Sequence, residues 1–244
     1  RAQQYLYSIR NSHKIVVSYK HVKDDLIKYY QVNPSKIHVC PIPIDQITLE
    51  NPSVKEQEEY KNKKVYNGDF LLYPAQTWPH KNHINLLKAL KKINNTDVKL
   101  RLICTGKLNE HYYNHIEPFI KKNNMQNQVY FAGLVPEKEL QWLYKNTILT
   151  VIPTKYEAGS FPLMEAMALK SPVICSNVTS LPKTIGDLDL VFDPDNVTEL
   201  AEKITKYSRS LAKRKKAIEK NYKKYQCLCD RDTITPFIKI WKSI

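Results

Sequence analysis

The sequence lacks several features that would place it in a common class of proteins. No run of apolar residues approaches the roughly 20 that a membrane-spanning helix needs. The first residues also lack the charged, apolar and small-residue succession of a signal peptide. The patterns G-x-G-x-x-G and G-x-x-x-x-G-K-S/T are both absent from a chain with only 5 glycines in 244 residues. These absences exclude the usual dinucleotide-binding and P-loop interpretations.

Cysteine and histidine do not predict a disulfide framework or a metal centre. The 5 cysteines are an odd number, which favours a reducing compartment. Cys227 and Cys229 form a C-x-C without a second pair nearby. His111 and His115 have the spacing of a metal pair, but the third ligand and the glutamate of a zinc hydrolase are missing. We therefore expect neither a metal nor a cofactor.

Positive charge dominates the composition, with a formal net charge of +14. The run "LAKRKKAIEKNYKKY" (residues 211–225) places basic side chains on several faces of one predicted helix. Such a helix either binds an anionic membrane surface or is the solvated face of a lysine-rich protein, and both interpretations stay open. Nucleic acid is not an expected partner, because the basic residues are spread out and the sequence contains no known nucleic-acid-binding motif.

From residue 68 onward, apolar strand-like segments alternate with amphipathic helical segments. The predicted strands cover residues 69–74, 99–106, 128–133, 148–153, 171–177 and part of 188–194. Six such alternations with short connections predict an α/β fold, a doubly wound Rossmann-like parallel sheet with helices on both faces. Ligands bind such sheets at the carboxyl ends of the strands, where the winding reverses. We therefore expect the loops after Pro74, Gly106, Gly133 and Pro153 to converge on a site.

Less regular segments flank this repeating part. Residues 13–20 and 36–45 are predicted strands with a short amphipathic helix between them. Residues 46–67 are polar, charged and poor in core residues, which predicts a linker. Near the other end, Asn196 with Glu199 three residues later predicts a capping box for the helix that follows.

The stretch "YEAGSFPLMEA" (residues 156–166) holds two glutamates eight positions apart. Gly159 and Pro162 argue against one continuous helix between them. Ser160 is a good N-cap, and proline is favoured in the first turn of a helix. We therefore expect Glu157 on the loop after a strand and Glu165 in the first turn of the helix that follows.

This geometry predicts an anion site between two carboxylates. The free N–H groups of Phe161, Leu163 and Met164 would point out of the helix N-terminus. Carboxylates accept hydrogen bonds from vicinal diols, so a nucleoside diphosphate sugar, with its anionic middle and a diol at each end, fits the pattern. The alternative is a helix cap by Glu165 with a surface Glu157. We prefer the site because a strand precedes the segment and a cationic loop lies in the same predicted plane.

That cationic loop is "YPAQTWPHKNH" (residues 73–83). Lys81 lies at a predicted helix start, where a cation opposes the helix dipole unless an anion binds there. A diphosphate between Lys81 and the helix that begins at Pro162 would neutralise the charge of Lys81 and would also interact favourably with the positive end of that helix. Taken alone, Lys81 would be interpreted as a solvated lysine at a helix end.

These motifs together resemble a known family. From about residue 68 the chain is similar to the C-terminal, donor-binding domain of the retaining GT-B glycosyltransferases of group 1, or family 4. The matching stretches are "EAGSFPLME", "AMALKSPVICSN", "FAGLVPEKELQWLY" and "VFDPDNVTELAEKI". The resemblance makes residues 68–226 the nucleotide-sugar-binding domain and residues 227–244 a C-terminal helix. Residues 1–45 resemble the C-terminal end of the acceptor-side Rossmann domain.

The resemblance also implies roles for particular residues. Glu157 would contact the transferred sugar and Lys81 the diphosphate, as the catalytic pair, while Glu165 would bind the ribose. The donor sugar and diphosphate would be contacted at Gln76, Gly159, Ser160, Phe161, Leu163 and Met164. Base contacts would come from Leu134 and Val135. Two departures are Gln76, where the family often has arginine, and "EAGS" in place of "EGFG".

The implied function is transfer of a hexose, with retention and without metal, from a nucleotide sugar to an acceptor glycan or lipid-linked saccharide. The "WPHKNH" stretch resembles mannosyltransferases and favours GDP-mannose over a UDP-sugar. We expect a cytoplasmic protein that is peripheral on the inner membrane face if it binds lipid. With only the end of the acceptor domain, these residues should bind donor weakly and turn over slowly or not at all. The alternatives are a non-catalytic nucleotide-sugar or anionic-membrane binding module, and a related epimerase or phosphorylase.

Overall fold

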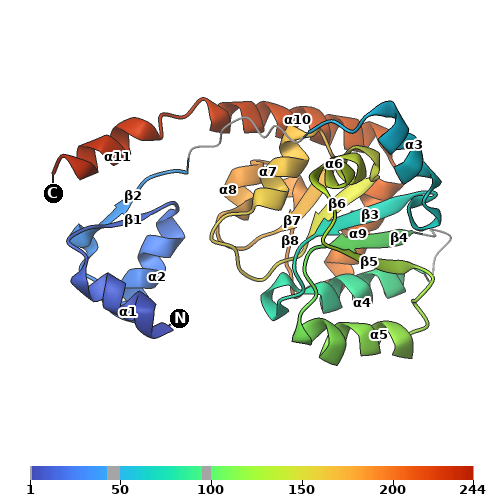
Figure 1. The fold of residues 1–244 in the computed structure, drawn as a ribbon, viewed down its shortest axis with the longest axis horizontal. Coiled ribbons are helices and arrows are strands. Elements are labelled where there is room, and N and C mark those ends of the chain that lie inside the picture. Colours follow the sequence, from blue (N-terminus) through green and yellow to red (C-terminus); the bar gives the residue numbers. More distant parts are fainter. Residues whose placement is uncertain (1, 43–49, 95–99, 244) are drawn as a thin grey trace. The chain divides into compact units, whose positions relative to one another are not determined.

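A parallel sheet dominates the computed structural model, which describes residues 2–42, 50–94 and 100–243 (Figure 1). Within these residues the larger sheet has six strands in the order β5-β4-β3-β6-β7-β8, and every neighbouring pair is parallel. The strands are β3 (Phe70–Pro74), β4 (Arg101–Thr105), β5 (Val129–Gly133), β6 (Leu149–Ile152), β7 (Val173–Ser176) and β8 (Val191–Phe192). Strands β3, β6, β7 and β8 are buried along their whole length, as expected for strands covered on both faces. The predicted doubly wound α/β fold is confirmed.

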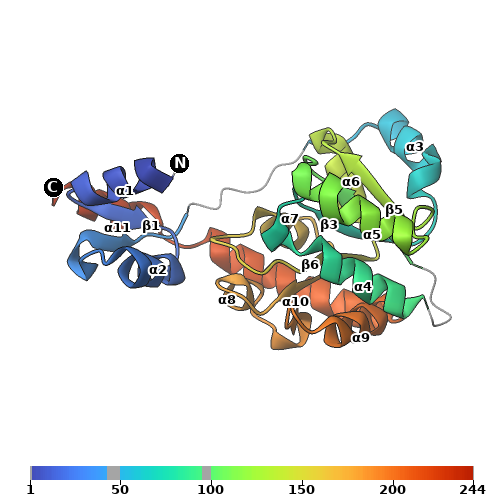
Figure 2. The same cartoon turned by 90° about the horizontal axis from the view of Figure 1, so that it is seen from below.

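The helices cover both faces of this sheet. Helices α4 (His83–Ile93) and α5 (Glu117–Lys122) lie on one side, and α6 (Glu137–Asn146) and α7 (Phe161–Ala168) lie on the other (Figure 1). The short helix α8 (Leu181–Ile185) packs on β7, and α9 (Val197–Ser208) packs beside α4 (Figure 2). The winding reverses between β3 and β6, which are neighbours in the sheet although β4 and β5 separate them in sequence. This switch point is where the fold predicts a ligand site.

The helical segment between β4 and β5 is irregular. It consists of a π-helical turn, η4 (Tyr112–Ile116), followed by α5. The capping box predicted at α9 is only half formed, because the Glu199 N–H donates to Asn196 Oδ1 at 3.0 Å whereas the Glu199 carboxylate accepts from the Asp193 N–H.

The loops after β3, β4 and β5 converge as predicted. The Ala75 N–H donates to the Thr105 carbonyl at 3.0 Å, and the Gly106 N–H donates to the Gly133 carbonyl at 2.7 Å. Gly106 has φ +109°, and a Cβ there would lie 2.7 Å from the carbonyl carbon of Ala75. Only glycine allows this approach, so Gly106 holds three loops together at the carboxyl edge of the sheet.

A smaller unit comprises residues 1–46 and 226–244, whereas residues 47–225 form the unit with the large sheet. In the smaller unit β1 (Ile15–Val17) pairs in parallel with β2 (Ile37–Val39), and α2 (Lys20–Tyr30) connects them. This is the strand–helix–strand succession that the sequence predicts. Helix α1 (Ala2–Asn11) precedes β1, and the short 3-10 turn η1 (Pro34–Lys36) precedes β2. The core of this unit is Val17, Val32 and Ile37.

The C-terminal residues form two helices where the sequence predicts one over residues 227–244. Helix α10 (Leu211–Cys229) ends just inside that range, and α11 (Ile234–Trp241) begins after a break. The reason is a local cap, because Asp232 Oδ1 accepts from the N–H groups of Ile234 and Thr235. Within the described ranges, no helix is long and apolar enough to cross a membrane.

The segment predicted as a linker is largely a structured part of the larger unit. Helix α3 (Val54–Asn62) and the 3-10 turn η2 (Lys64–Tyr66) occupy it, whereas residues 43–49 lie outside the described residues. Tyr60 and Tyr66 are buried, and their rings lie 6.1 Å and 5.8 Å from that of Trp142 on α6. The linker prediction was wrong over residues 54–66, because two tyrosines on an otherwise charged segment suffice to anchor it.

The first turn of α3 contains a further contact with α6, and this contact can be tested by mutation. Ser53 and Glu56 form a reciprocal capping box, and Lys138 on α6 pairs with Glu56 at 3.2 Å. The backbone and side-chain hydrogen bonds to Ser53, followed by the Lys138 hydrogen bond, lower the pKa of Glu56 to about 2.

We predict that Glu56→Gln removes an acid-sensitive part of the stability. A lowered pKa stabilises the folded chain above the unfolded pKa, and that stabilisation disappears as the pH falls toward about 2. Urea unfolding between neutral and acidic pH should therefore show a smaller loss of stability in Glu56→Gln than in the wild type. Identical pH dependence of the two chains would contradict the structured role of residues 54–66.

Candidate functional site

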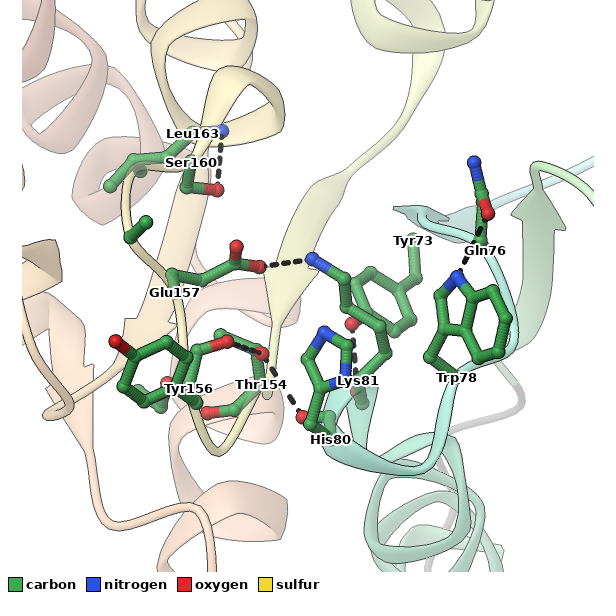
Figure 3. Close-up of polar contacts among 12 residues, drawn as sticks. Tyr73, Gln76, Trp78, His80, Lys81, Thr154, Tyr156, Glu157, Ser160 and Leu163 are labelled. Carbon is green, nitrogen blue, oxygen red and sulfur yellow. Dashed lines mark hydrogen bonds and ion pairs between the residues drawn. The ribbon is translucent and has the colours of Figure 1, made fainter. Parts of the chain in front are cut away.

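The predicted lysine and glutamate meet at the switch point of the sheet. Lys81 lies on the loop after β3 and Glu157 on the loop after β6 (Figure 3). Lys81 Nζ is 2.5 Å from Glu157 Oε1, and the two side chains are 18% and 10% exposed. A cation and a carboxylate from two distant segments are therefore held together in a largely buried position.

Neutral hydrogen bonds position the backbone around Lys81. Lys81 ends the 3-10 turn η3 (Pro79–Lys81), and the Tyr73 hydroxyl donates to its carbonyl at 2.7 Å. The next residue, Asn82, adopts the left-handed conformation with φ 61°, and its side-chain amide donates to the Pro153 carbonyl at 2.9 Å. Lys81 thus precedes α4 on a backbone that is fixed on both sides.

The loop that carries Glu157 is tied to the same turn. The Thr154 hydroxyl donates to the His80 carbonyl at 3.0 Å, and the Lys155 N–H donates to the same carbonyl at 2.7 Å (Figure 3). Ser176 on β7 donates to the Thr154 carbonyl at 2.6 Å. These bonds join the ends of β3, β6 and β7 across the switch point.

Helix α7 begins with the N-cap that the sequence predicts. Ser160 is the N-cap, with its hydroxyl accepting from the Leu163 N–H at 3.4 Å, and Pro162 lies in the first turn. The N–H groups of Leu163 and Met164, expected to point at an anion, instead donate to the Ser160 side chain and carbonyl. That prediction was wrong, because the cap and the helix already use these donors. Gly159, Ser160 and Phe161 remain as backbone candidates for an anion.

Glu165 is the fifth residue of α7, just past the first turn in which the sequence placed it. Its Oε2 accepts from the Tyr144 hydroxyl of α6 at 2.8 Å. Burial raises the pKa of Glu165, while the hydrogen bond from Tyr144 lowers it. A half-buried carboxylate that already accepts one hydroxyl has the chemistry needed to accept others from a diol.

Gln76, Leu134 and Val135 border the same edge of the sheet. Gln76 follows β3, and its Oε1 accepts from the Trp78 indole N–H at 2.9 Å. Leu134 and Val135 follow β5, and Leu134 is 77% exposed. The two residues also line a cavity of about 420 Å³ whose opposite wall includes Lys63 to Tyr66 of the segment predicted as a linker.

A buried histidine next to the site stays uncharged. His83 is 2% exposed and lies against the rings of Tyr73 and Phe131. Burial, with a smaller contribution from His111, lowers the pKa of His83 to about 3. His83 is therefore neutral near pH 7 and adds no second positive charge beside Lys81.

Some supporting residues were not singled out from the sequence. Tyr144 and Tyr73 look like ordinary apolar residues of a helix and a strand, and Asn82 and Thr154 look like loop residues. Only their partners reveal their roles. In the part of the chain that the structure describes, no group of three or more His, Cys, Asp or Glu residues is placed to hold a metal ion.

This arrangement of sheet and loops belongs to a known family. Residues 54–224, more than half of the chain, match the family described as glycosyl transferases group 1. The chain therefore belongs to that family. The matched region begins at the first residue of α3, so the segment predicted as a linker is part of it.

Curated relatives of the chain include bacterial mannosyltransferases. The O-antigen chain mannosyltransferase B of Escherichia coli is 33% identical over 141 residues, which cover 55% of this chain and 35% of that protein. The O-antigen chain mannosyltransferase RfbU of Salmonella typhimurium is 27% identical over 214 residues, which cover 84% of this chain and 56% of that protein. The matched residues thus span between about a third and somewhat more than half of these relatives.

Solved structures share the fold. A glycosyltransferase from Rickettsia africae superposes with a TM-score of 0.79 at 22% identity, over 99% of this chain and 66% of that one. HepE of Anabaena, in complex with UDP and glucose, superposes with a TM-score of 0.80 at 15% identity, over 100% and 67%. At these identities the likeness concerns the fold, which is that of the GT-B glycosyltransferases.

We predict that Lys81 and Glu157 stabilise the chain as a coupled pair. Lys81→Met leaves a carboxylate that is 10% exposed without its cation, and should lower the free energy of unfolding by about 1.5–3 kcal/mol. The double variant Lys81→Met/Glu157→Gln should recover part of that loss, since no unpaired charge remains. Urea unfolding of the two single variants and the double variant measures the coupling, and strictly additive losses would exclude it.

Proposed function

We propose that this chain is the donor-binding part of a retaining, family 4 glycosyltransferase. It binds a nucleoside diphosphate sugar. The enzyme transfers the hexose of that donor, mannose, to an acceptor glycan or a lipid-linked saccharide. GDP-mannose is the proposed donor, supported by the relatives named as mannosyltransferases. A UDP-sugar is the competing donor, since UDP is bound in the similar structure of HepE. The proposal needs no metal and no cofactor.

The observation that carries the proposal is the pair of Lys81 and Glu157 at the switch point, beside the capped start of α7. A diphosphate bound there takes the place of the Glu157 carboxylate against Lys81. Glu157 is then released to accept hydrogen bonds from hydroxyls of the donor sugar. Glu165, eight residues further along the chain, accepts hydrogen bonds from the ribose diol.

The chemistry follows from these charges. The bond between the sugar carbon and the diphosphate oxygen breaks, and Lys81 stabilises the negative charge that develops on the diphosphate. The acceptor hydroxyl forms its bond to the sugar carbon on the same face, and its proton passes to a diphosphate oxygen. Neither glutamate acts as a nucleophile, because Glu157 orients the sugar and Glu165 holds the ribose. Attack from the leaving-group face retains the configuration.

Calorimetric titration with GDP-mannose, UDP-glucose and UDP-GlcNAc tests the binding step. We predict that Lys81→Ala weakens binding of the preferred donor by about 1.5–3 kcal/mol, the usual value of a charged hydrogen bond. Lys121→Ala is a matched control, because Lys121 also pairs with a glutamate, Glu117, but on the exposed surface of α5. The absence of binding of any nucleotide sugar to the wild-type chain would refute the proposal.

The pH dependence of donor binding should identify Glu165 as the ribose ligand. Its carboxylate must be ionised to accept two hydroxyls, and burial raises its pKa, so affinity should fall as the pH drops through that raised value. Tyr144→Phe removes the hydrogen bond that lowers this pKa and should move the midpoint to higher pH. Glu165→Gln should abolish this dependence of donor affinity on pH. If the midpoint is the same in Tyr144→Phe and the wild type, Glu165 is not the titrating ligand.

A further inference from the structure

A second cavity lies away from the donor site, among α4, α9 and the start of α10, which are neighbours in the fold (Figure 2). Its volume is about 540 Å³. Its lining includes the last residues of α4 and α9 together with Ser210 and Lys213 at the beginning of α10. Helix α4 begins next to Lys81 and is about 16 Å long at 1.5 Å per residue, so the cavity is at the far end of that helix from the donor site.

The side chains around this cavity are strongly cationic. Lys92, Lys206, Arg209 and Lys213 line it, and Glu202 is the one acidic residue of the lining. Across the described ranges, none of these four cations forms an ion pair with a carboxylate, whereas Lys63, Lys81, Lys138 and Lys220 all do. Lys92 instead donates to the Thr198 hydroxyl at 2.7 Å. The cavity therefore concentrates positive charge that the protein itself does not neutralise.

Helix dipoles account for three of these four cations but not for the fourth. Lys92 and Lys206 lie in the last turns of α4 and α9, and Arg209 is the C-cap of α9, so a cation is favourable at all three positions. Lys213 lies in the first turn of α10, which contains no acidic residue, so its positive charge opposes the dipole of that helix. An anion in the cavity would compensate the Lys213 side chain and the positive end of the α10 dipole at once.

We propose that this cavity binds a phosphate-bearing group. The ligand is an anion of small size, with Arg209 and Lys213 as its principal contacts and Lys92 and Lys206 at the opposite wall. Two sources supply such a group, the headgroup of an anionic phospholipid and a free phosphorylated metabolite. Leu211, 58% exposed beside the cavity, would contact the acyl region in the first case. The proposal is independent of donor binding, because it uses none of the residues of that site.

The test compares two variants of equal charge change in the full 244-residue chain. Arg209→Gln/Lys213→Gln removes two cations from the cavity, and Lys121→Gln/Lys122→Gln removes two from α5. One arm titrates inorganic pyrophosphate and follows the amide NMR signals of Thr198 and Ser210, with Gly159 reporting separately on the donor site. The other arm measures flotation with phosphatidylcholine vesicles, with and without phosphatidylglycerol.

We expect at least one probe to bind at least about tenfold more weakly to the cavity variant than to the α5 control. A pyrophosphate response alone identifies a free phosphate as the ligand, and a vesicle response alone identifies a lipid headgroup. If both variants behave alike toward both probes, only net charge matters and the proposal is wrong. It is equally wrong if neither probe binds the wild-type chain.

Discussion

The ion pair between Lys81 and Glu157 is the interaction on which the site depends. The two residues are 76 positions apart, and they meet only because the winding of the sheet reverses between β3 and β6. Each charge is too buried to be left without a partner. The proposed diphosphate would replace the Glu157 carboxylate with a charge of the same sign.

The groups that support this pair are almost all neutral. Tyr73, Asn82 and Thr154 bond to backbone carbonyls, and His83 remains uncharged among aromatic rings. Neutral supports hold the two loops in place without competing for the charges of the pair. The positive charge of Lys81 is thus left to its carboxylate partner Glu157, in a geometry that the neutral hydrogen bonds fix.

The sheet, the loop convergence and the cap at Ser160 were predictable because each follows from local pattern. Apolar strands alternating with amphipathic helices define a parallel sheet, and Ser160 followed by Pro162 marks a helix start. The contact between Lys81 and Glu157 was not predictable, since it depends on tertiary geometry. The donors of Leu163 and Met164 were assigned to a ligand although the cap that the same residues predicted already engages them. Helix α3 was missed because charge dominates its sequence and only two tyrosines anchor it.

Helix α3 also determines where the larger unit can be cut. The composition of the chain suggests a domain that begins at residue 68, but Tyr60 and Tyr66 cover Trp142 from the other side of that boundary. A chain shortened to residue 68 would lose this cover and expose an indole ring on α6, together with the Glu139 carboxylate that Lys63 now neutralises at 2.6 Å. Such a protein would expose a new apolar surface next to an unpaired carboxylate, and we expect it to aggregate during expression.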